Sequence, residues 1–187
     1  MIQDPADLDL GPLAAVLYGP TDDADSLLSD FAQALLRQGV RVGGVVQNNV
    51  RDAVGKKTGM EVIDLADGHA ISICQPLGSG AMACTLDAGG LAEAAVAVQR
   101  AIDARVDLIV VNKFAKQEAA GGGLRDELAQ AIVSGIPVLT AVPEKCVAEW
   151  QAFTANCGTT LQPSRDALDA WWREMSSGLH RARETSA

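Results

Sequence analysis

A polar pair at the end of an apolar run is the part of this sequence best placed to do chemistry. The run is Leu108 to Val111, the pair is Asn112 and Lys113, and Gly121 to Gly123 precede a helical pattern that begins at Leu124. A buried parallel strand presents side chains at its carboxyl end in this way. Carboxylates at such a strand end would hold magnesium and activate water. Because an amide and an ammonium group stand there instead, the pair indicates a site but argues against that chemistry.

A second candidate segment follows the apolar run from Leu13 to Tyr18. It reads Gly19-Pro20-Thr21-Asp22-Asp23-Ala24-Asp25-Ser26. Compared with the phosphate-binding pattern Gly-x4-Gly-Lys-Ser/Thr, it keeps the first glycine and the final serine, but Ala24 replaces glycine and Asp25 replaces lysine. Acidic residues also favour the first turn of any helix, so an ordinary capped helix is an alternative explanation.

Alternating strand and helix patterns position these two segments. The predicted strands are residues 13–18, 40–47, 108–111 and 138–142, and a hairpin joins residues 61–66 to 70–74 through Asp67-Gly68. Helical patterns begin at Thr21 or Asp22, at Leu91, at Leu124, near 146 and near 165. This alternation predicts an α/β fold with a mostly parallel sheet covered on both faces. In such a sheet, ligands bind beyond the carboxyl ends of the strands, where both segments lie.

The composition favours a single domain that contains one substantial core, because 48% of its 187 residues are hydrophobic. We expect a loose N-terminal arm at residues 1–11, a core at residues 13–155 and a C-terminal helix at residues 164–180. The net charge of −9 argues against nucleic acid and anionic membranes as partners. Arg51, Lys56 and Lys57 form a small basic group in a predicted loop.

No stretch approaches the roughly 20 apolar residues of a membrane span, and the N-terminus is acidic where a secretory signal would be basic. We therefore expect a cytoplasmic protein without membrane insertion. Its four cysteines are widely spaced, which predicts reduced thiols rather than a metal site.

The strand order, the hairpin after the second strand and the polar strand end together resemble the small P-loop nucleoside triphosphatases and the P-loop accessory proteins of molybdopterin dinucleotide synthesis. The motif Asn-Lys-Phe-x-Lys-x-Glu-Ala-x-Gly-x-Gly-x-Arg from Asn112 to Arg125 resembles a bacterial branch of that fold whose members are often labelled as linked to molybdate transport. The resemblance covers about residues 13–155 and implies a three-layer P-loop fold with an inserted β-hairpin. In the triphosphatases the strand ends Asp-Glu, with another Glu a few residues later; those places hold Asn112, Lys113 and Glu118 here.

These departures predict that Mg-ATP is not hydrolysed efficiently. Asp25 in place of the P-loop lysine would repel the β and γ phosphates. Asn112 offers magnesium only a neutral oxygen, and Lys113 cannot act as a carboxylate base. The charge is reversed at both positions relative to the triphosphatases, and the two new charges have opposite signs. We therefore expect Asp25 and Lys113 to form an ion pair if their loops adjoin.

The leading hypothesis is an accessory, storage or delivery protein that binds a small oxyanion. Backbone N–H groups of the helix near Ala24 and of the glycine cluster, with nearby cations, would hold it. The predicted ligand-binding residues are Gly19, Thr21, Asp25, Ser26, Gln47, Asn112, Lys113, Lys116, Glu118, Gly121, Gly123 and Arg125. Molybdate or tungstate is suggested only by the resemblance, and a phosphate-like anion fits the same chemistry.

Two other functions stay open. One is a nucleotide hydrolase or transferase that uses Ser26, Lys113 and Glu118 in a rearranged site. The other is a scaffold whose C-terminal helix, with Trp171 and Trp172, contacts a partner or a second copy of the chain. We assign no catalytic residue and no metal ligand, and the sequence leaves open whether Asp22, Asp23 and Asp25 hold a cation.

Overall fold

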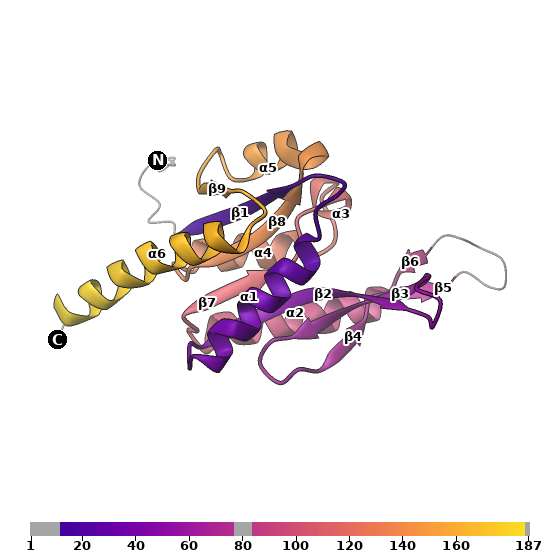
Figure 1. Ribbon diagram of the computed structural model, residues 1–187, viewed down its shortest axis with the longest axis horizontal. Helices are drawn as coiled ribbons and strands as arrows, with labels where there is room; N and C mark the ends of the chain where they lie inside the picture. Colours follow the sequence, from indigo (N-terminus) through magenta and orange to yellow (C-terminus); the bar gives the residue numbers. More distant parts are fainter. Residues whose placement is uncertain (1–11, 77–83, 186–187) are drawn as a thin grey trace, which may run out of the picture.

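The computed structural model describes residues 12–76 and 84–185, so the predicted N-terminal arm at residues 1–11 lies outside the described residues. Within these ranges one seven-stranded sheet has the order β4-β3-β2-β7-β8-β1-β9 (Figure 1). Its strands are β1 (Leu13–Tyr18), β2 (Val42–Arg51), β3 (Lys57–Asp64), β4 (Ala70–Ser72), β7 (Leu108–Val111), β8 (Val138–Pro143) and β9 (Thr159–Leu161). Neighbours from β2 to β9 pair in parallel, whereas β3 and β4 pair antiparallel. A separate antiparallel pair consists of β5 (Cys74–Pro76) and β6 (Cys84–Leu86).

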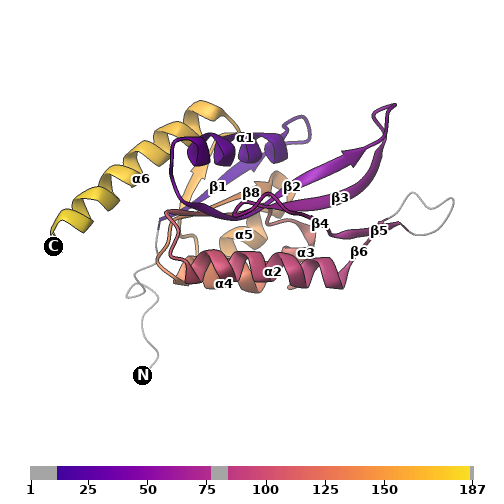
Figure 2. The ribbon, with the colours of Figure 1, turned by 90° about the horizontal axis from the view of Figure 1, so that it is seen from below.

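Helices cover both faces of the sheet. They are α1 (Ala24–Arg37), α2 (Ala88–Asp103), α3 (Lys116–Ala119), α4 (Arg125–Val133), α5 (Val147–Phe153) and α6 (Arg165–Thr185), with a 3-10 turn at Glu144–Cys146. Figure 2 shows α1 and α6 on one face and α2 and α4 on the other. Each face has its own apolar cluster. This three-layer arrangement confirms the predicted α/β fold class.

Helix α1 begins at the carboxyl end of the parallel strands. Leu28, Phe31 and Leu35, spaced three or four residues apart, are buried on one face, which directs the helix onto the sheet. Asp23 is the N-cap, one or two residues later than the predicted caps. Gly39 has a φ of +81°, a conformation that favours glycine, and it ends the helix as predicted. The first turn of α1 is thereby held next to the ends of the strands.

Strand β2 is longer than predicted, which corrects the expected position of several polar residues. The sequence pattern ended this strand at Gln47 and placed Lys57 in a loop, but β2 continues to Arg51 and pairs with β3 from Lys57 onward. The connecting turn is closed by the Asp52 carboxylate, which accepts the N–H groups of Val54 at 3.1 Å and Lys56 at 2.9 Å. Gln47 therefore lies within a strand rather than at its end.

The C-terminal helix packs on the core. Leu168, Trp171 and Met175 are buried in the same apolar cluster as Phe31 of α1, and Trp172 is partly buried against it. None of the helices in residues 12–76 and 84–185 has the length and apolar character needed to cross a membrane.

The cysteines differ in state, which corrects the expectation that all of them are reduced. Cys74 is disulfide-bonded. Cys146 is free and buried, and Cys157 is free and exposed.

Candidate functional site

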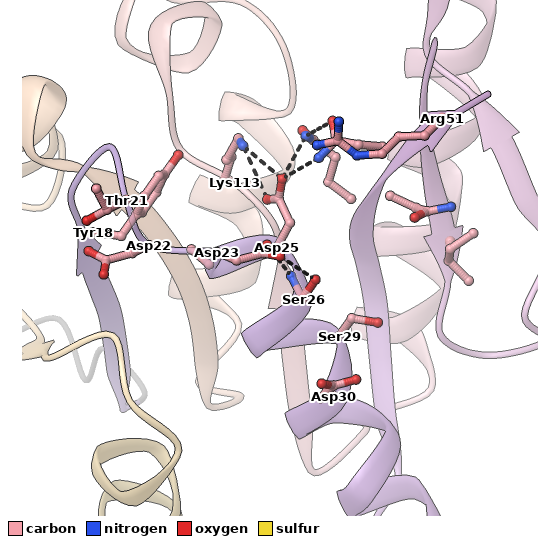
Figure 3. Close-up of a pocket in the computed structure, with 15 residues that line it drawn as sticks. Tyr18, Thr21, Asp22, Asp23, Asp25, Ser26, Ser29, Asp30, Arg51 and Lys113 are labelled. Carbon is pink, nitrogen blue, oxygen red and sulfur yellow. Dashed lines mark hydrogen bonds and ion pairs between the residues drawn. The ribbon is translucent and has the colours of Figure 1, made fainter. Parts of the chain in front are cut away.

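The two candidate segments meet at the Asp25 carboxylate, as expected from their complementary charges. The Lys113 Nζ lies 3.2 Å from Oδ1 and 3.3 Å from Oδ2 of Asp25 (Figure 3). The side chain of Asp25 is 14% exposed and that of Lys113 is 22% exposed, so solvent screens the pair only in part. The predicted pairing of Asp25 with Lys113 is confirmed.

Three amide groups donate to the same carboxylate. Asn112 Nδ2 lies 3.0 Å from Oδ1, while Gln47 Nε2 and Asn49 Nδ2 each lie 3.0 Å from Oδ2. Successive side chains of a strand point to opposite faces, so Gln47 and Asn49 share the face that meets α1. Asn48 points the other way and donates to Glu61 at 2.7 Å. Asp25 thus has hydrogen-bond partners from both β2 and the segment after β7.

The carboxylates of the first loop accept hydrogen bonds from that loop itself. Asp23 accepts the backbone N–H of Ser26 at 3.0 Å and its hydroxyl at 2.8 Å, and these bonds lower the pKa of Asp23. Asp22 accepts the N–H of Gly19 at 2.7 Å. The N–H groups of Gly19 and Ser26, which a phosphate-binding loop would offer to its ligand, therefore donate to side chains of the same loop.

Glu118 holds together the segment between α3 and α4. Its carboxylate accepts the N–H groups of Ala115 at 3.0 Å and Leu124 at 3.1 Å. Burial raises the pKa of this carboxyl, although both hydrogen bonds and the charge of Lys113 act in the opposite direction. Arg125 donates to the carbonyl of Glu118 at 2.9 Å, and its guanidinium lies 4.4 Å from the centre of the Phe153 ring. Both charged side chains have structural contacts that account for their positions.

Two cavities open beside the Asp25 cluster, which we define as Asp25, Gln47, Asn49, Asn112 and Lys113. The larger cavity has a volume of about 620 Å³ and contains four aspartates but only two cationic groups in its lining. The aspartates are Asp22, Asp23, Asp25 and Asp30, and the cations are Arg51 and Lys113. Its lining therefore carries a net negative charge.

The smaller cavity has a volume of about 320 Å³ and the opposite balance of charge. Its lining includes Lys57, Lys113 and Lys116 beside Asp25 and Glu118. Lys57 is exposed at the mouth of this cavity, but partial desolvation lowers its pKa, and the positive charge of Lys113 lowers it further against the opposing effect of Asp25. An anion near these two ammonium groups would relieve their repulsion.

The predicted binding residues divide between these two cavities. Thr21 and Ser26 line only the larger one. Asn112, Lys116, Glu118 and Gly123 line only the smaller one, whereas Asp25, Gln47 and Lys113 line both. Gly19, Gly121 and Arg125 line neither of the two.

Sequence reasoning missed Lys57 as a site residue and left Asn49 out of the predicted binding residues. The short prediction for β2 explains both, because the shared face of Gln47 and Asn49 and the pairing of Lys57 become visible only once the strand is extended. The motif from Asn112 located the part of the smaller cavity that Asn112, Lys113, Lys116, Glu118 and Gly123 line.

The polar end of β7 has one further distinctive feature. The Oδ1 atom of Asn112 is buried and has no hydrogen-bond partner among the described residues. The peptide bond between Asn112 and Lys113 is cis. No group of three or more His, Cys, Asp or Glu residues in the described ranges is arranged to hold a metal ion.

Two solved structures share this fold. The solution structure of a human cancer-related nucleoside triphosphatase has a TM-score of 0.63 and 14% identity, and the match covers 91% of this chain and 97% of that chain. The crystal structure of THEP1 from the hyperthermophile Aquifex aeolicus has a TM-score of 0.62 and 16% identity, with coverage of 87% and 96%. At these identities the similarity establishes the fold alone, which is that of P-loop nucleoside triphosphatases and confirms the expected resemblance.

Sequence comparison identifies the family. The protein named "Molybdenum import ATP-binding protein ModC 2" from Bradyrhizobium diazoefficiens is 62% identical over 179 residues, which are 96% of this chain and 20% of that protein. The chain therefore spans about a fifth of the length of that relative. The family described as "Protein of unknown function (DUF2478)" matches residues 13–171. The chain belongs to the DUF2478 family.

Proposed function

We propose that this chain is a cytoplasmic accessory protein that binds a small oxyanion on a P-loop-type fold and does not hydrolyse nucleoside triphosphates efficiently. The fold and the name of the 62% identical relative both suggest binding of a nucleotide or an oxyanion. The observation that favours an oxyanion is the contact between Asp25 and Lys113, which lie 3.2 Å apart. A carboxylate stands where a P-loop would need its lysine, and its own partner is the ammonium group at the end of β7.

A triphosphate does not fit the residues of the first loop. The N–H groups of Gly19 and Ser26 donate to Asp22 and Asp23, and the cavity beside them contains four aspartates. A triphosphate there would meet like charges at short range. The Ser26 hydroxyl donates to Asp23, and both carboxylate oxygens of Glu118 accept backbone N–H groups. These contacts give no support to the alternative of a hydrolase built on Ser26 and Glu118.

The smaller cavity suits a compact oxyanion. Lys57, Lys113 and Lys116 line it, and the lowered pKa of Lys57 reflects both burial and the neighbouring charge of Lys113. A bound anion would favour the charged form of Lys57 and would therefore be stabilised by it. Molybdate is suggested by the word molybdenum in the name of the relative, and tungstate and phosphate are also tetrahedral oxyanions.

Calorimetry of the full chain at low salt tests this proposal. Sodium molybdate, tungstate, phosphate and sulfate are titrated separately, with Mg-ATP in a parallel experiment. We expect binding of at least one oxyanion and no sustained phosphate release from Mg-ATP. The absence of both heat and thermal stabilisation with all four oxyanions would contradict the proposal.

Two lysine variants locate the bound anion. Lys57→Met and Lys116→Met should each weaken binding by about tenfold, since each removes a positive charge from the cavity lining. Lys56→Met is the matched control, because Lys56 precedes Lys57 directly and is exposed as Lys57 and Lys116 are, but lines neither cavity. An equal loss in all three variants would indicate a general charge effect instead of this cavity.

A further inference from the structure

The Asp25 carboxylate lies in a set of hydrogen-bond donors that would equally suit a free anion. Three amide nitrogens lie 3.0 Å from its oxygens, and the Lys113 ammonium contacts both oxygens at 3.2 and 3.3 Å. Gln47 and Asn49 lie in β2, and Asn112 and Lys113 directly follow β7, whereas Asp25 itself belongs to α1. A carboxylate has about four lone-pair directions, and here both of its oxygens are used.

We infer that Gln47, Asn49, Asn112 and Lys113 form an anion-binding cradle, and that Asp25 is an internal anion that competes with the oxyanion ligand for it. This inference rests on the proposed oxyanion function and makes it more specific. Asp25 then opposes ligand binding, although it lies at the centre of the site. The ligand class is a small oxyanion with at least two oxygens that can accept hydrogen bonds, as the carboxylate does.

The cradle borders space that a ligand can enter. All four cradle residues line the smaller cavity, next to Lys57 and Lys116. An anion in that cavity would lie beside Lys113 and would replace some of the contacts that Lys113 and the amides make with Asp25. The negative charge of Asp25 would repel that anion at short range, because the two would share the same donors.

Neutralising Asp25 should therefore strengthen oxyanion binding. Asp25→Asn keeps the size of the side chain and removes its charge, so we expect the affinity for phosphate, sulfate or molybdate to rise by about tenfold or more. Asp30→Asn is the matched control, since Asp30 also belongs to α1 and lines the larger cavity but not the smaller one. Its effect on affinity should stay within about threefold.

The same titrations distinguish failure of this inference from failure of the proposed function. If the wild-type chain binds an oxyanion but Asp25→Asn binds it equally or more weakly, the competing role of Asp25 is wrong and the proposed function stands. If only Asp25→Asn binds, the cradle is supported and the proposed function of the native chain is wrong. If neither binds, both are wrong. An equal gain in Asp30→Asn would also overturn the inference.

A measurement on the wild-type chain covers the case in which Asp25→Asn does not fold. The carboxyl ¹³C resonance of Asp25 is followed by NMR during titration with phosphate and, separately, with molybdate. Displacement from the cradle changes its hydrogen-bond partners and should shift this resonance in parallel with binding, while the resonance of Asp30 stays in place. Saturation with a bound oxyanion and no movement of the Asp25 resonance would overturn the inference.

Discussion

Lys113 contacts both oxygens of Asp25, at 3.2 and 3.3 Å, and the two residues lie 88 positions apart in the sequence. In the P-loop triphosphatases that this chain resembles, the residue that corresponds to Asp25 is basic and the residue that corresponds to Lys113 is acidic. The charges of the two positions are therefore exchanged relative to that pattern, and in this chain the two residues form an ion pair. What changes is the charge that the first loop presents to a ligand.

The Asp25–Lys113 contact should appear as energetic coupling. Lys113→Met leaves the partly buried carboxylate with amide partners only, and we expect it to lower the free energy of unfolding by about 1–3 kcal/mol. In a cycle with Asp25→Asn, the double variant should lose less stability than the sum of the single variants, with a coupling of about 0.5–3 kcal/mol. Urea unfolding of the wild type, the two single variants and the double variant gives the four free energies of unfolding. Additive losses would show that the contact contributes nothing to stability.

The Asp23 N-cap should make stability depend on pH. The pKa of Asp23 is lowered in the folded state by hydrogen bonds from Ser26, so its contribution is fully present at pH values well above 3.8 and is lost as the pH falls through the lowered pKa. Asp23→Ala should cost about 1 kcal/mol at pH 7 and less near pH 3. Asp23→Asn keeps a hydrogen-bond acceptor at the N-cap that does not titrate, so most of the stability at pH 7 should remain. A loss in Asp23→Ala that is independent of pH would contradict this assignment.

Glu118 should act on stability through its two backbone contacts. In Glu118→Gln the side-chain NH₂ must face the N–H of either Ala115 or Leu124, which leaves a donor without its partner and should cost about 1–3 kcal/mol. Glu149→Gln is the control, because Glu149 is exposed on α5. Thermal unfolding at neutral pH compares the two variants with the wild type. Equal melting temperatures for all three would refute the structural role of Glu118.

Gly123 and Gly121 offer a matched test of the same segment. Both have positive φ, +60° and +92°, so alanine should cost about 1–2 kcal/mol of conformational energy at either position. A methyl group at Gly123 would also collide with Oε1 of Glu118, whereas one at Gly121 meets nothing within 4 Å. Gly123→Ala should therefore destabilise the chain more than Gly121→Ala in urea unfolding. Equal losses in the two variants would show that Glu118 moves aside without cost.

The two neighbouring tryptophans of α6 should differ in their effect on stability. Trp171 is 8% exposed within the core cluster, and Trp171→Ala should cost about 3–5 kcal/mol. Trp172 is only partly buried, so Trp172→Ala should cost less. If Trp172→Ala also lowers the oligomeric mass in analytical ultracentrifugation, the hypothesis of a scaffold that acts through α6 gains support. Equal destabilisation by both substitutions would contradict the packing of α6.

Local patterns in the sequence predicted the layers of the fold. The apolar runs that became β1, β7 and β8 are short and uncharged, and the spacing of Leu28, Phe31 and Leu35 predicted the buried face of α1, because burial selects residues by a period that is visible along the chain. The charges of Asp25 and Lys113 also predicted their contact. Each charge is reversed relative to the triphosphatases, and opposite charges on two neighbouring loops favour an ion pair.

The full length of β2, and the side-chain positions that follow from it, could not be predicted from the same patterns. Polar residues at Gln47 to Asn49 and the cations Arg51 and Lys57 are typical of a loop, yet pairing with β3 keeps them in a strand. The register of that pairing directs Gln47 and Asn49 toward α1 and brings Lys57 into the lining of the smaller cavity. A similar limit applies to Glu118, whose burial depends on the path of the backbone from Ala115 to Leu124.

By itself, the sequence determined which elements form, which faces they bury and which two charges are complementary. The tertiary structure decided which groups meet at Asp25, because its four hydrogen-bonding side chains lie 22, 24, 87 and 88 positions away along the chain. Strand order and register bring them within 3.0 to 3.3 Å of one carboxylate. Hydrophobic periodicity is a local signal, whereas a convergence of donors depends on pairings between distant segments.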